Sequence, residues 1–326
     1  MNIDKNYPLV SLISINYNQS GVTLEFLESL SKLTYPNYEV IVIDNASPND
    51  TPDIIKTKYP NTILIKSETN LGFAGGNNIG IINSKGKYLL FINNDTEVEP
   101  DFLEPLVDAF ESDSTLGMVS PKIIFHHSKS ERLMQYAGGS EINYTKGTGH
   151  FYGYGEIDKG QYNTTYTNLI HGAAVMVPRE LMKTVGVWPD VYFLYYEEID
   201  WSEHFKKSGY KLKYISESTI YHKESISIGK ATPLRVFYMN RNRQLFIRRN
   251  ASGFNTITAL LYFYIASVPK STFYFLFKKK FDLLSALWRG IVWNIIHIRG
   301  LKQNPLLIEK DDDIKIVNST YKYTKL

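Results

Sequence analysis

Strand-like and helix-like patterns alternate regularly over the first part of the chain. Between Pro8 and about Asp95, four runs rich in apolar residues are typical of buried strands: VSLISINYN, YEVIVIDNAS, TILIKS and KYLLFINND. The segments between them have helical character, most clearly LEFLESLSKL, in which leucines recur every third residue from 24 to 33. This β-α-β-α-β-α-β order predicts a mostly parallel, Rossmann-like α/β sheet with helices on both faces, whose ligands bind at the carboxyl ends of the strands.

The rest of the chain continues this pattern and then changes composition. A helix is predicted over residues 99–113 and a strand over 118–125, followed by a Gly- and Tyr-rich insertion at 126–166 that has no clear period. A second block of strand and helix patterns ends near Arg248–Arg249, where a Tyr-, Phe- and Leu-rich tail begins. We therefore expect one domain over residues 1–250 and a helical tail over residues 251–326.

Composition narrows the class of protein. The 326 residues are 43% hydrophobic and 21% charged, enough to bury one large core. The absence of cysteine excludes disulfides, thiolate metal sites and a cysteine nucleophile, and is typical of a reducing compartment. A net charge of +3 is too small to indicate a nucleic-acid partner. The first residues, MNIDKNYPLV, lack the basic and apolar regions of a signal peptide, so we expect a cytoplasmic location.

The strongest chemical signal is the segment INNDT at residues 92–96, where an apolar run ends abruptly in polar side chains. Asp95 can bind a hard cation through oxygen, and Asn93 or Asn94 can hydrogen-bond a ribose or a metal-bound water. The alternative is that Asn-Asn-Asp merely caps the next turn.

Two other predicted strands also end in polar residues. Asn16 and Asn18 follow the first strand, and Asp44 and Asn45 end the second. Because the carboxyl ends of parallel strands share one edge of a sheet, we expect these side chains to converge on Asp95, where such a cluster can hold a base and a ribose.

A glycine-rich turn, NLGFAGGNNIG at residues 70–80, adds Gly72 and Asn77 to the candidate ligand-binding residues. Its glycines can bring the backbone close to a phosphate or a sugar at the start of a helix. The turn matches neither GxGxxG nor GxxxxGK[ST], and glycine-rich turns are common, so the signal is weak by itself.

Six segments taken together resemble family-2 glycosyltransferases of the rhamnosyltransferase-like group. They occur in order over residues 8–250: VSLISINYN, VIDNAS, NLGFAGGNNIG, INNDT, HGAAVMVPRE and FLYYEEIDWSEHFKKSGY. The resemblance implies a GT-A fold, in which a nucleotide-sugar domain is merged with an acceptor-binding half. The metal-binding DxD-type element of that family falls on Asn93–Asn94–Asp95, and this chain departs from the pattern by having amides at the first two positions.

The acidic pair of the family falls on Glu197–Glu198, with Asp200 just beyond it. The resemblance implies that the second acid, Glu198, is the general base that takes a proton from the acceptor hydroxyl while the oxygen attacks the anomeric carbon. The alternative is that these three acids only favour the positive end of the helix that follows.

The same resemblance supplies candidates for the metal and the diphosphate. His222, after a later strand, is similar to the histidine that completes the metal site with the DxD-type aspartate, and an imidazole plus a carboxylate suits Mn²⁺ or Mg²⁺. Arg241 and Asn242, within YMNRNRQLFIRRN, resemble an Arg-Asn pair common near the end of these catalytic domains, and Arg241 or Lys230 can neutralise the leaving diphosphate. A solvated basic face is the alternative for both of these cations.

The expected activity is therefore inverting, metal-dependent transfer of a sugar, rhamnose or similar, from a nucleoside diphosphate sugar to a lipid-linked or polysaccharide acceptor in cell-surface glycan synthesis. One alternative is a sugar-nucleotide pyrophosphorylase, but the segment after the first strand, INYNQSGV, lacks the basic residues that such an enzyme needs. Another is an inactive membrane-bound sugar-binding module, which leaves the acidic pair unexplained.

The tail suggests a membrane surface. Its apolar run is interrupted at Pro269–Lys270, so it is too short to span a bilayer. From 251 to 303 it has seven Lys or Arg (270, 278, 279, 280, 289, 299 and 302) against Asp282 alone, interleaved with aromatic residues. This pattern is typical of amphipathic helices that lie on an anionic leaflet, here the cytoplasmic face of the plasma (inner) membrane. The alternative is that these helices pack on the domain or form a homodimer interface.

Overall fold

The computed structural model describes residues 7–223, 231–297, 304–310 and 313–322. The alternation predicted for the first part of the chain is present. Its elements are β1 (Val10–Asn16), α1 (Ser20–Leu30), β2 (Tyr38–Asp44), α2 (Asp53–Lys58), β3 (Ile63–Lys66), α3 (Gly72–Asn83) and β4 (Tyr88–Ile92). β4 is buried throughout, which is why its sequence is continuously apolar.

The second half adds strands to the same sheet. Its elements are β5 (Thr96–Val98), α4 (Leu103–Ser112), β6 (Leu116–Phe125), β7 (Met134–Tyr136), β8 (Thr165–Thr167), β9 (Ala174–Pro178), α5 (Glu197–Lys207) and β10 (Lys211–His222). The insertion at 126–166 contains only short pieces of regular structure within otherwise irregular chain.

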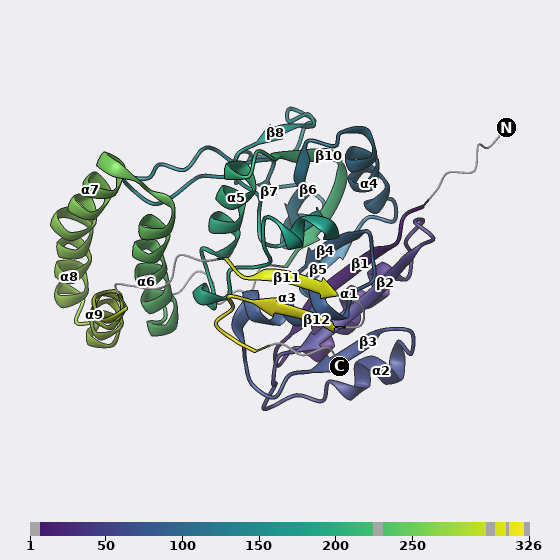
Figure 1. Cartoon of the computed structure of the whole chain (residues 1–326), viewed down its shortest axis with the longest axis horizontal. Coiled ribbons are helices and arrows are strands. Elements are labelled where there is room, and N and C mark those ends of the chain that lie inside the picture. The colour runs from purple at the N-terminus through teal and green to yellow at the C-terminus, as the bar shows by residue number, and fades with distance from the viewer. Residues whose placement is uncertain (1–6, 224–230, 298–303, 311–312, 323–326) are drawn as a thin grey trace.

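The sheet has the order β3-β2-β1-β4-β9-β6-β10-β5 (Figure 1). The first four strands are parallel, as predicted, and place Asn16 beside Asp44. In the second half, β9 is antiparallel to both β4 and β6, while β10 is parallel to β6. The parallel region is therefore confined mainly to the first half, because β9 reverses direction between the two parts.

Alternate residues of the strands belong to two hydrophobic cores, one on each face of the sheet. On β2, Val42 belongs to the core beneath α1 and α4, whereas Ile41 and Ile43 belong to the core beneath α3 and α5. This period of two is what a sheet covered on both faces requires.

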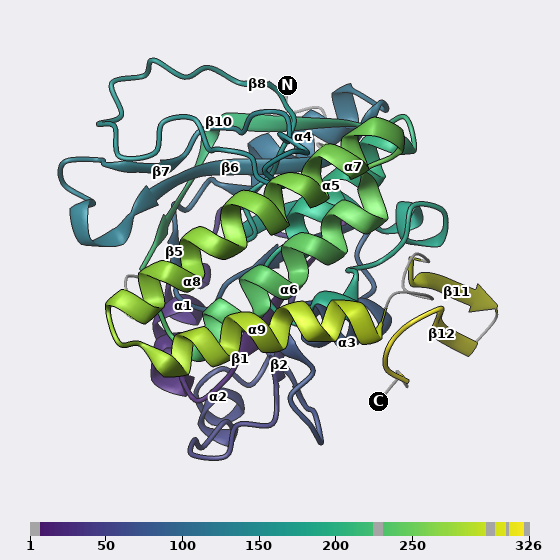
Figure 2. The ribbon, with the colours of Figure 1, turned by 90° about the vertical axis from the view of Figure 1, so that its left-hand side faces the viewer.

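A layer of helices stands beside the sheet domain. It consists of α6 (Pro233–Asn250), α7 (Gly253–Leu261), a π-helical turn (Tyr262–Ser267), α8 (Val268–Phe277) and α9 (Phe281–Ile296). Figure 2 faces this layer and shows α7 and α8 following one line, with α9 beside α6. Because α6 shares a core with α8 and α9, the helical layer begins before residue 250.

The tail is not helical to its end. Residues 306–317 form an antiparallel hairpin of β11 (Leu306–Lys310) and β12 (Asp313–Val317), which corrects the expectation of a wholly helical segment. Leu307 and Ile316 enter the core of the sheet domain, and Glu309 pairs with Arg179 there. In Figure 1 the hairpin lies against the sheet domain, away from α7 and α8.

Candidate active site

The polar ends of β1 and β2 lie against each other. Asn16 is fully buried, and its amide donates to Asp44 Oδ1 at 2.8 Å and to Asp50 Oδ2 at 3.1 Å. The Thr23 hydroxyl donates to Asn16 Oδ1 at 3.0 Å and accepts from the amide of Asn94, beyond β4, at 2.9 Å. The strand ends therefore converge as the sequence predicts, and their side chains are largely engaged with one another.

Asn18 and Asn77 also make hydrogen bonds within the chain. Asn18 has left-handed backbone, with φ of 55°, and its side-chain oxygen accepts from Asn49 N–H at 3.0 Å. Asn77 is buried and donates to Phe73 O at 3.1 Å within α3. Asn77 is thus a helix residue that faces the protein interior, which removes it from the candidates for donor contact.

Gly72 allows the segment that precedes α5 to pack closely against the start of α3. Its φ is +70°, and a β-carbon here would lie 2.1 Å from Phe193 O. Asn45 holds the same turn, donating to Gly72 O at 2.9 Å and accepting from Leu71 N–H at 2.9 Å. The sequence predicts a close approach of phosphate or sugar at this glycine, but the Phe193 backbone lies there instead.

We expect Gly72→Ala to destabilise the fold by about 1–3 kcal/mol, because overpacking against backbone cannot be relieved by a rotamer change. Gly21→Ala is the matched control, since a β-carbon at Gly21 meets no atom within 4 Å and Gly21 lies in α1. That change should stabilise by about 0.5–1 kcal/mol. Urea unfolding of both variants measures the difference, and equal midpoints would contradict the close contact with Phe193.

Asp95 and His222 form the candidate metal pair. They lie beyond β4 and at the end of β10, with His222 Nε2 3.1 Å from Asp95 Oδ1. Burial opposes ionisation of Asp95, but the hydrogen bond and charge of His222 keep the pKa of Asp95 below its ordinary value. The Asn93 amide nitrogen lies 3.4 Å from His222 Nε2. Asn93 and Asp95 thus approach the imidazole, while Asn94 turns toward Thr23.

These residues fit a divalent cation that is shared with a substrate. Gln135 Oε1 lies 2.8 Å from His222 Nδ1, a contact that favours a proton on Nδ1 and directs Nε2 toward Asp95. Among the residues that the structure describes, no group of three or more acidic or histidine side chains gathers at one point. The protein therefore offers two strong ligands, which suits a cation completed by phosphate oxygens and water.

A cavity of about 600 Å³ lies between His222 of this pair and the acidic residues of α5. The residues that line it include Asn93, His222, Glu197, Glu198 and Arg235 of α6. Its lining is otherwise largely apolar and aromatic, with Phe73, Phe151, His171, Tyr195 and Tyr196 among its members. Such a cavity has the size and character of a small-molecule site.

The two glutamates begin α5 and have unusual environments. Burial raises the pKa of Glu198 to about 7. Glu197 is 4% exposed, and burial together with the neighbouring Glu198 charge raises its pKa well above the ordinary value. Two adjacent carboxyls in such a site titrate as a pair, and Glu198, the more accessible of the two, is suited to exchange a proton near neutral pH.

The turn that leads into these glutamates is strained. Phe193, Tyr195 and Tyr196 have φ values of 67°, 69° and 78°. Leu194 N–H donates to Tyr192 O at 2.8 Å, closing a γ-turn of the rare positive-φ type around Phe193. Each such residue costs of order 1–3 kcal/mol, and strain of this kind is concentrated at functional sites.

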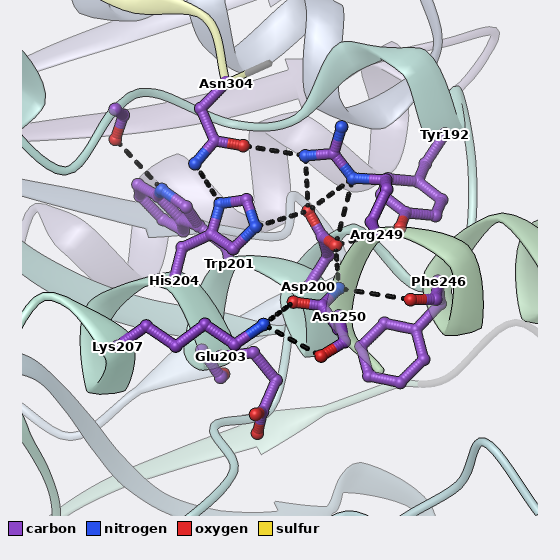
Figure 3. Close-up of polar contacts among 12 residues, drawn as sticks. Tyr192, Asp200, Trp201, Glu203, His204, Lys207, Phe246, Arg249, Asn250 and Asn304 are labelled. Carbon is purple, nitrogen blue, oxygen red and sulfur yellow. Dashed lines mark hydrogen bonds and ion pairs between the residues drawn. The ribbon is translucent and has the colours of Figure 1, made fainter. Parts of the chain in front are cut away.

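Asp200 does not face the cavity, which corrects its place among the catalytic candidates. It is fully buried, and its carboxylate lies 3.0 Å from Arg249 Nη2 and accepts from Tyr192 OH at 2.9 Å (Figure 3). Burial opposes ionisation, but Arg249 and His204 keep the pKa of Asp200 below its ordinary value. Figure 3 also shows Asn304 between His204 and Arg249, so this network joins α5 to α6 and to the segment before β11.

Arg241 is likewise removed from the cavity. Its guanidinium lies over the Trp293 ring at 4.2 Å, is buried, and donates to Val191 O. From α6 it is Arg235, with Met239, that reaches the cavity wall. Lys230, the other predicted partner of the diphosphate, lies outside the described residues.

Several residues at the site escape sequence reasoning. Thr23, Asp50 and Gln135 carry no motif of their own, because their importance comes from the partners that the fold brings to them. Asn242 is adjacent to Arg241 in the sequence and contacts the strained turn. The family resemblance marks it as part of the Arg-Asn pair but gives it no role.

The chain is similar in sequence to known glycosyltransferases. Residues 11–180 match the family model described as Glycosyl transferase family 2. An uncharacterised glycosyltransferase of Haemophilus influenzae is 32% identical over 125 residues, covering 38% of this chain and 40% of that protein. The N-acetylglucosaminyl-diphospho-decaprenol L-rhamnosyltransferase of Mycobacterium tuberculosis is 21% identical over 272 residues, covering 75% of this chain and 86% of the relative. The chain thus spans less than half of the first relative and most of the second.

Among solved structures, GalNAc-T7 with UDP, GalNAc and Mn²⁺ is similar in fold. Its TM-score is 0.60 at 16% identity, and the match covers 74% of this chain and 49% of that one. This likeness supports the GT-A architecture. Together with the family model, which spans more than half of the sequence, it leads to one conclusion: the chain belongs to glycosyl transferase family 2.

Proposed function

We propose that the protein transfers a sugar, with inversion, from a nucleoside diphosphate sugar to an acceptor hydroxyl, with the help of a divalent cation. The observation that carries this proposal is that one cavity contains His222 and Asn93, beside Asp95, together with Glu198. Shared lining of one cavity supports a diphosphate-holding element and a base that act on one substrate, as displacement at an anomeric carbon requires.

The donor is proposed to lie across the strand ends. Its nucleoside is placed near Asn16, Asn18 and Asp44, and its diphosphate near Asp95 and His222. Mn²⁺ or Mg²⁺, held by Asp95 and His222, would neutralise the charge that develops on the leaving diphosphate. UDP and Mn²⁺ in the structure of GalNAc-T7 support this choice of ligands.

Glu198 is proposed to accept the proton of the acceptor hydroxyl. Its raised pKa makes the carboxylate a stronger base than an ordinary glutamate while leaving much of it ionised near neutral pH. A single displacement opposite the leaving group inverts the anomeric configuration, and no nucleophile of the protein is needed.

This assignment predicts a pH dependence. The base must be ionised, so kcat should rise with pH, reach half of its plateau near pH 7, and fall about tenfold per unit at lower pH. A profile of kcat from pH 5.5 to 8.5 at saturating substrates measures this. A flat profile down to pH 5.5 would contradict a base with a raised pKa.

Rhamnose is proposed as the donor sugar and a lipid-linked glycan as the acceptor, with a polysaccharide as the other choice. The name of the mycobacterial relative supports both parts, because that protein is an L-rhamnosyltransferase for a sugar on diphospho-decaprenol. Aromatic and apolar side chains line the cavity, as sugar-binding sites often require.

The acceptor chemistry is proposed to place the protein on the cytoplasmic face of a membrane. No helix in the described part of the chain is long and apolar enough to cross a bilayer. However, Phe273, Phe277 and Phe281 are 71%, 83% and 62% exposed around the turn between α8 and α9. Lys278, Lys279 and Lys280 occupy the turn itself, so cations and aromatics project together, as binding to an anionic leaflet requires.

Vesicle flotation tests the membrane contact. Replacing the three lysines of this turn by Gln should reduce binding to anionic vesicles about 10²-fold, since each cation near the surface contributes about 1 kcal/mol. The matched control replaces the exposed lysines Lys32, Lys58 and Lys85 by Gln, and should bind nearly as the unchanged protein does. If both variants bind anionic vesicles equally well, the exposed helices do not contact a membrane in this way and are better explained as a packing or homodimer surface.

A thermal-shift panel of nucleoside diphosphates and their sugars tests the proposed donor class. One nucleotide, with Mn²⁺ present, should stabilise the protein by about 3 kcal/mol at a hundred times its dissociation constant. A sugar-nucleotide pyrophosphorylase would instead respond to nucleoside triphosphate with sugar 1-phosphate, and an inactive sugar-binding module would respond to no nucleotide.

A further inference from the structure

The strained turn before Glu197, residues 192–196, is hydrogen-bonded by one side-chain amide of α6. Asn242 is fully buried, and its side-chain nitrogen lies 3.1, 2.7 and 2.8 Å from the carbonyl oxygens of Tyr192, Leu194 and Tyr195. One NH₂ group therefore contacts three carbonyls of the turn, with its two hydrogens shared among them. Of these three carbonyls, that of Tyr192 also accepts from Leu194 N–H, at 2.8 Å.

Further contacts complete the support of the same turn. Arg241, next to Asn242, donates to Val191 O, and Phe73 N–H donates to Phe193 O at 2.7 Å from the side of α3. Every carbonyl from residue 191 to residue 195 thus accepts a hydrogen bond. Left-handed conformations of non-glycine residues persist only where the surroundings determine them in this way.

The turn has one direct structural consequence. It ends at Tyr196, and α5 begins with Glu197 and Glu198, which line the cavity. A relaxed turn would change the direction in which α5 starts, because Phe193, Tyr195 and Tyr196 would return to negative φ. The side chain of Glu198 would then enter the cavity at a different place.

We propose that Asn242 is a positioning residue for the carboxylate of Glu198, and that it acts by keeping the turn at 192–196 in its strained form. This inference rests on the proposed role of Glu198 as the base. It also gives α6, through Asn242, a part in the reaction.

The first test compares Asn242→Ala with Asn240→Ala. Asn240 lies on the same helix and donates to Val236 O at 2.8 Å, but it does not contact the turn, so it is a matched control. Asn242→Ala should lower kcat about 10- to 100-fold, because a shift of about 1 Å in a reacting group costs up to 10²-fold, while KM for the donor stays within about threefold. Asn240→Ala should keep kcat within about twofold.

A double-mutant cycle separates positioning from general loss of structure. If Asn242 acts through Glu198, adding Asn242→Ala to Glu198→Gln should lower kcat by less than about threefold more. A further loss of 10- to 100-fold would overturn the positioning role alone. Full activity of Glu198→Gln by itself would instead overturn the assignment of the base, and this inference with it.

If Asn242→Ala lacks a cooperative unfolding transition, Asn242→Ser takes its place, since the hydroxyl keeps one donor. Its kcat per folded molecule should fall about 3- to 10-fold, less than for loss of all donors. A loss of activity that matches the unfolded fraction, with unchanged kcat in the remainder, would overturn the proposal.

Discussion

Glu198→Gln should lose transfer activity by about 10²- to 10⁴-fold while it keeps the fold and the affinity for nucleoside diphosphate. The amide has nearly the shape of the carboxyl group but cannot accept a proton from the acceptor hydroxyl. The loss should appear in kcat, measured at saturating donor and acceptor. Calorimetric titration with nucleoside diphosphate and Mn²⁺ should give a dissociation constant within about threefold of the original.

Glu203→Gln is the matched control for this change. Glu203 lies on the same helix and is 6% exposed, and its carboxylate pairs with Lys206 and accepts from Tyr144 instead of facing the cavity. Its replacement should lower the free energy of unfolding and leave kcat little changed. If Glu198→Gln turns over normally, the base must be Glu197, since Asp200 is occupied by Arg249.

Asp95→Ala and His222→Ala should each lower turnover about 10²-fold or more and weaken Mn²⁺ binding in the presence of nucleoside diphosphate. The expected effect is large because no third acidic or histidine side chain among the described residues gathers with this pair, so either change leaves one strong ligand. Titration of Mn²⁺ followed by electron paramagnetic resonance measures the bound fraction directly.

His126→Ala is the control for the histidine. Its imidazole pairs with Glu97 at 3.0 Å and is 32% exposed, away from the cavity lining. It should leave Mn²⁺ binding unchanged. Equal activity of the unchanged protein in EDTA and in Mn²⁺ would show that the pair holds no required metal.

The sheet domain could be predicted because its strands carry their own signal. Tyr88–Ile92 is continuously apolar and Val10–Asn16 is rich in apolar residues, since both strands are buried, and the polar residues that end them mark the edge where ligands are expected. The reversal at β9 could not be predicted, because the period of a strand does not show its direction.

The candidate site was predicted only in part. The pairing of Asp95 with His222, 127 positions apart in the sequence, came from the resemblance to a family and has no local pattern. Asp200 was misplaced although helix geometry argues against it: two positions along an α-helix turn a side chain by about 200°, away from the face of Glu198.

Arg241 and the β11–β12 hairpin are two other features that could not be predicted correctly from the sequence. An arginine near a site suggests a diphosphate partner, but burial against Trp293 depends on how α6 packs on α9, which one sequence does not show. The segment LLIEKDDDIKIV has the alternation of a hairpin, yet its place at the end of a helical tail favoured the wrong prediction.

The central claim is a metal-dependent, inverting transfer from a nucleotide sugar, and the most direct test is to follow the donor. The protein would be incubated with a panel of nucleoside diphosphate sugars and a lipid-linked acceptor, with Mn²⁺ or with EDTA. We expect one donor to release nucleoside diphosphate only with Mn²⁺, and proton NMR of the glycoside to show the anomeric configuration opposite to that of the donor. Release that is equal in EDTA, or a product that retains the configuration of the donor, would contradict the claim.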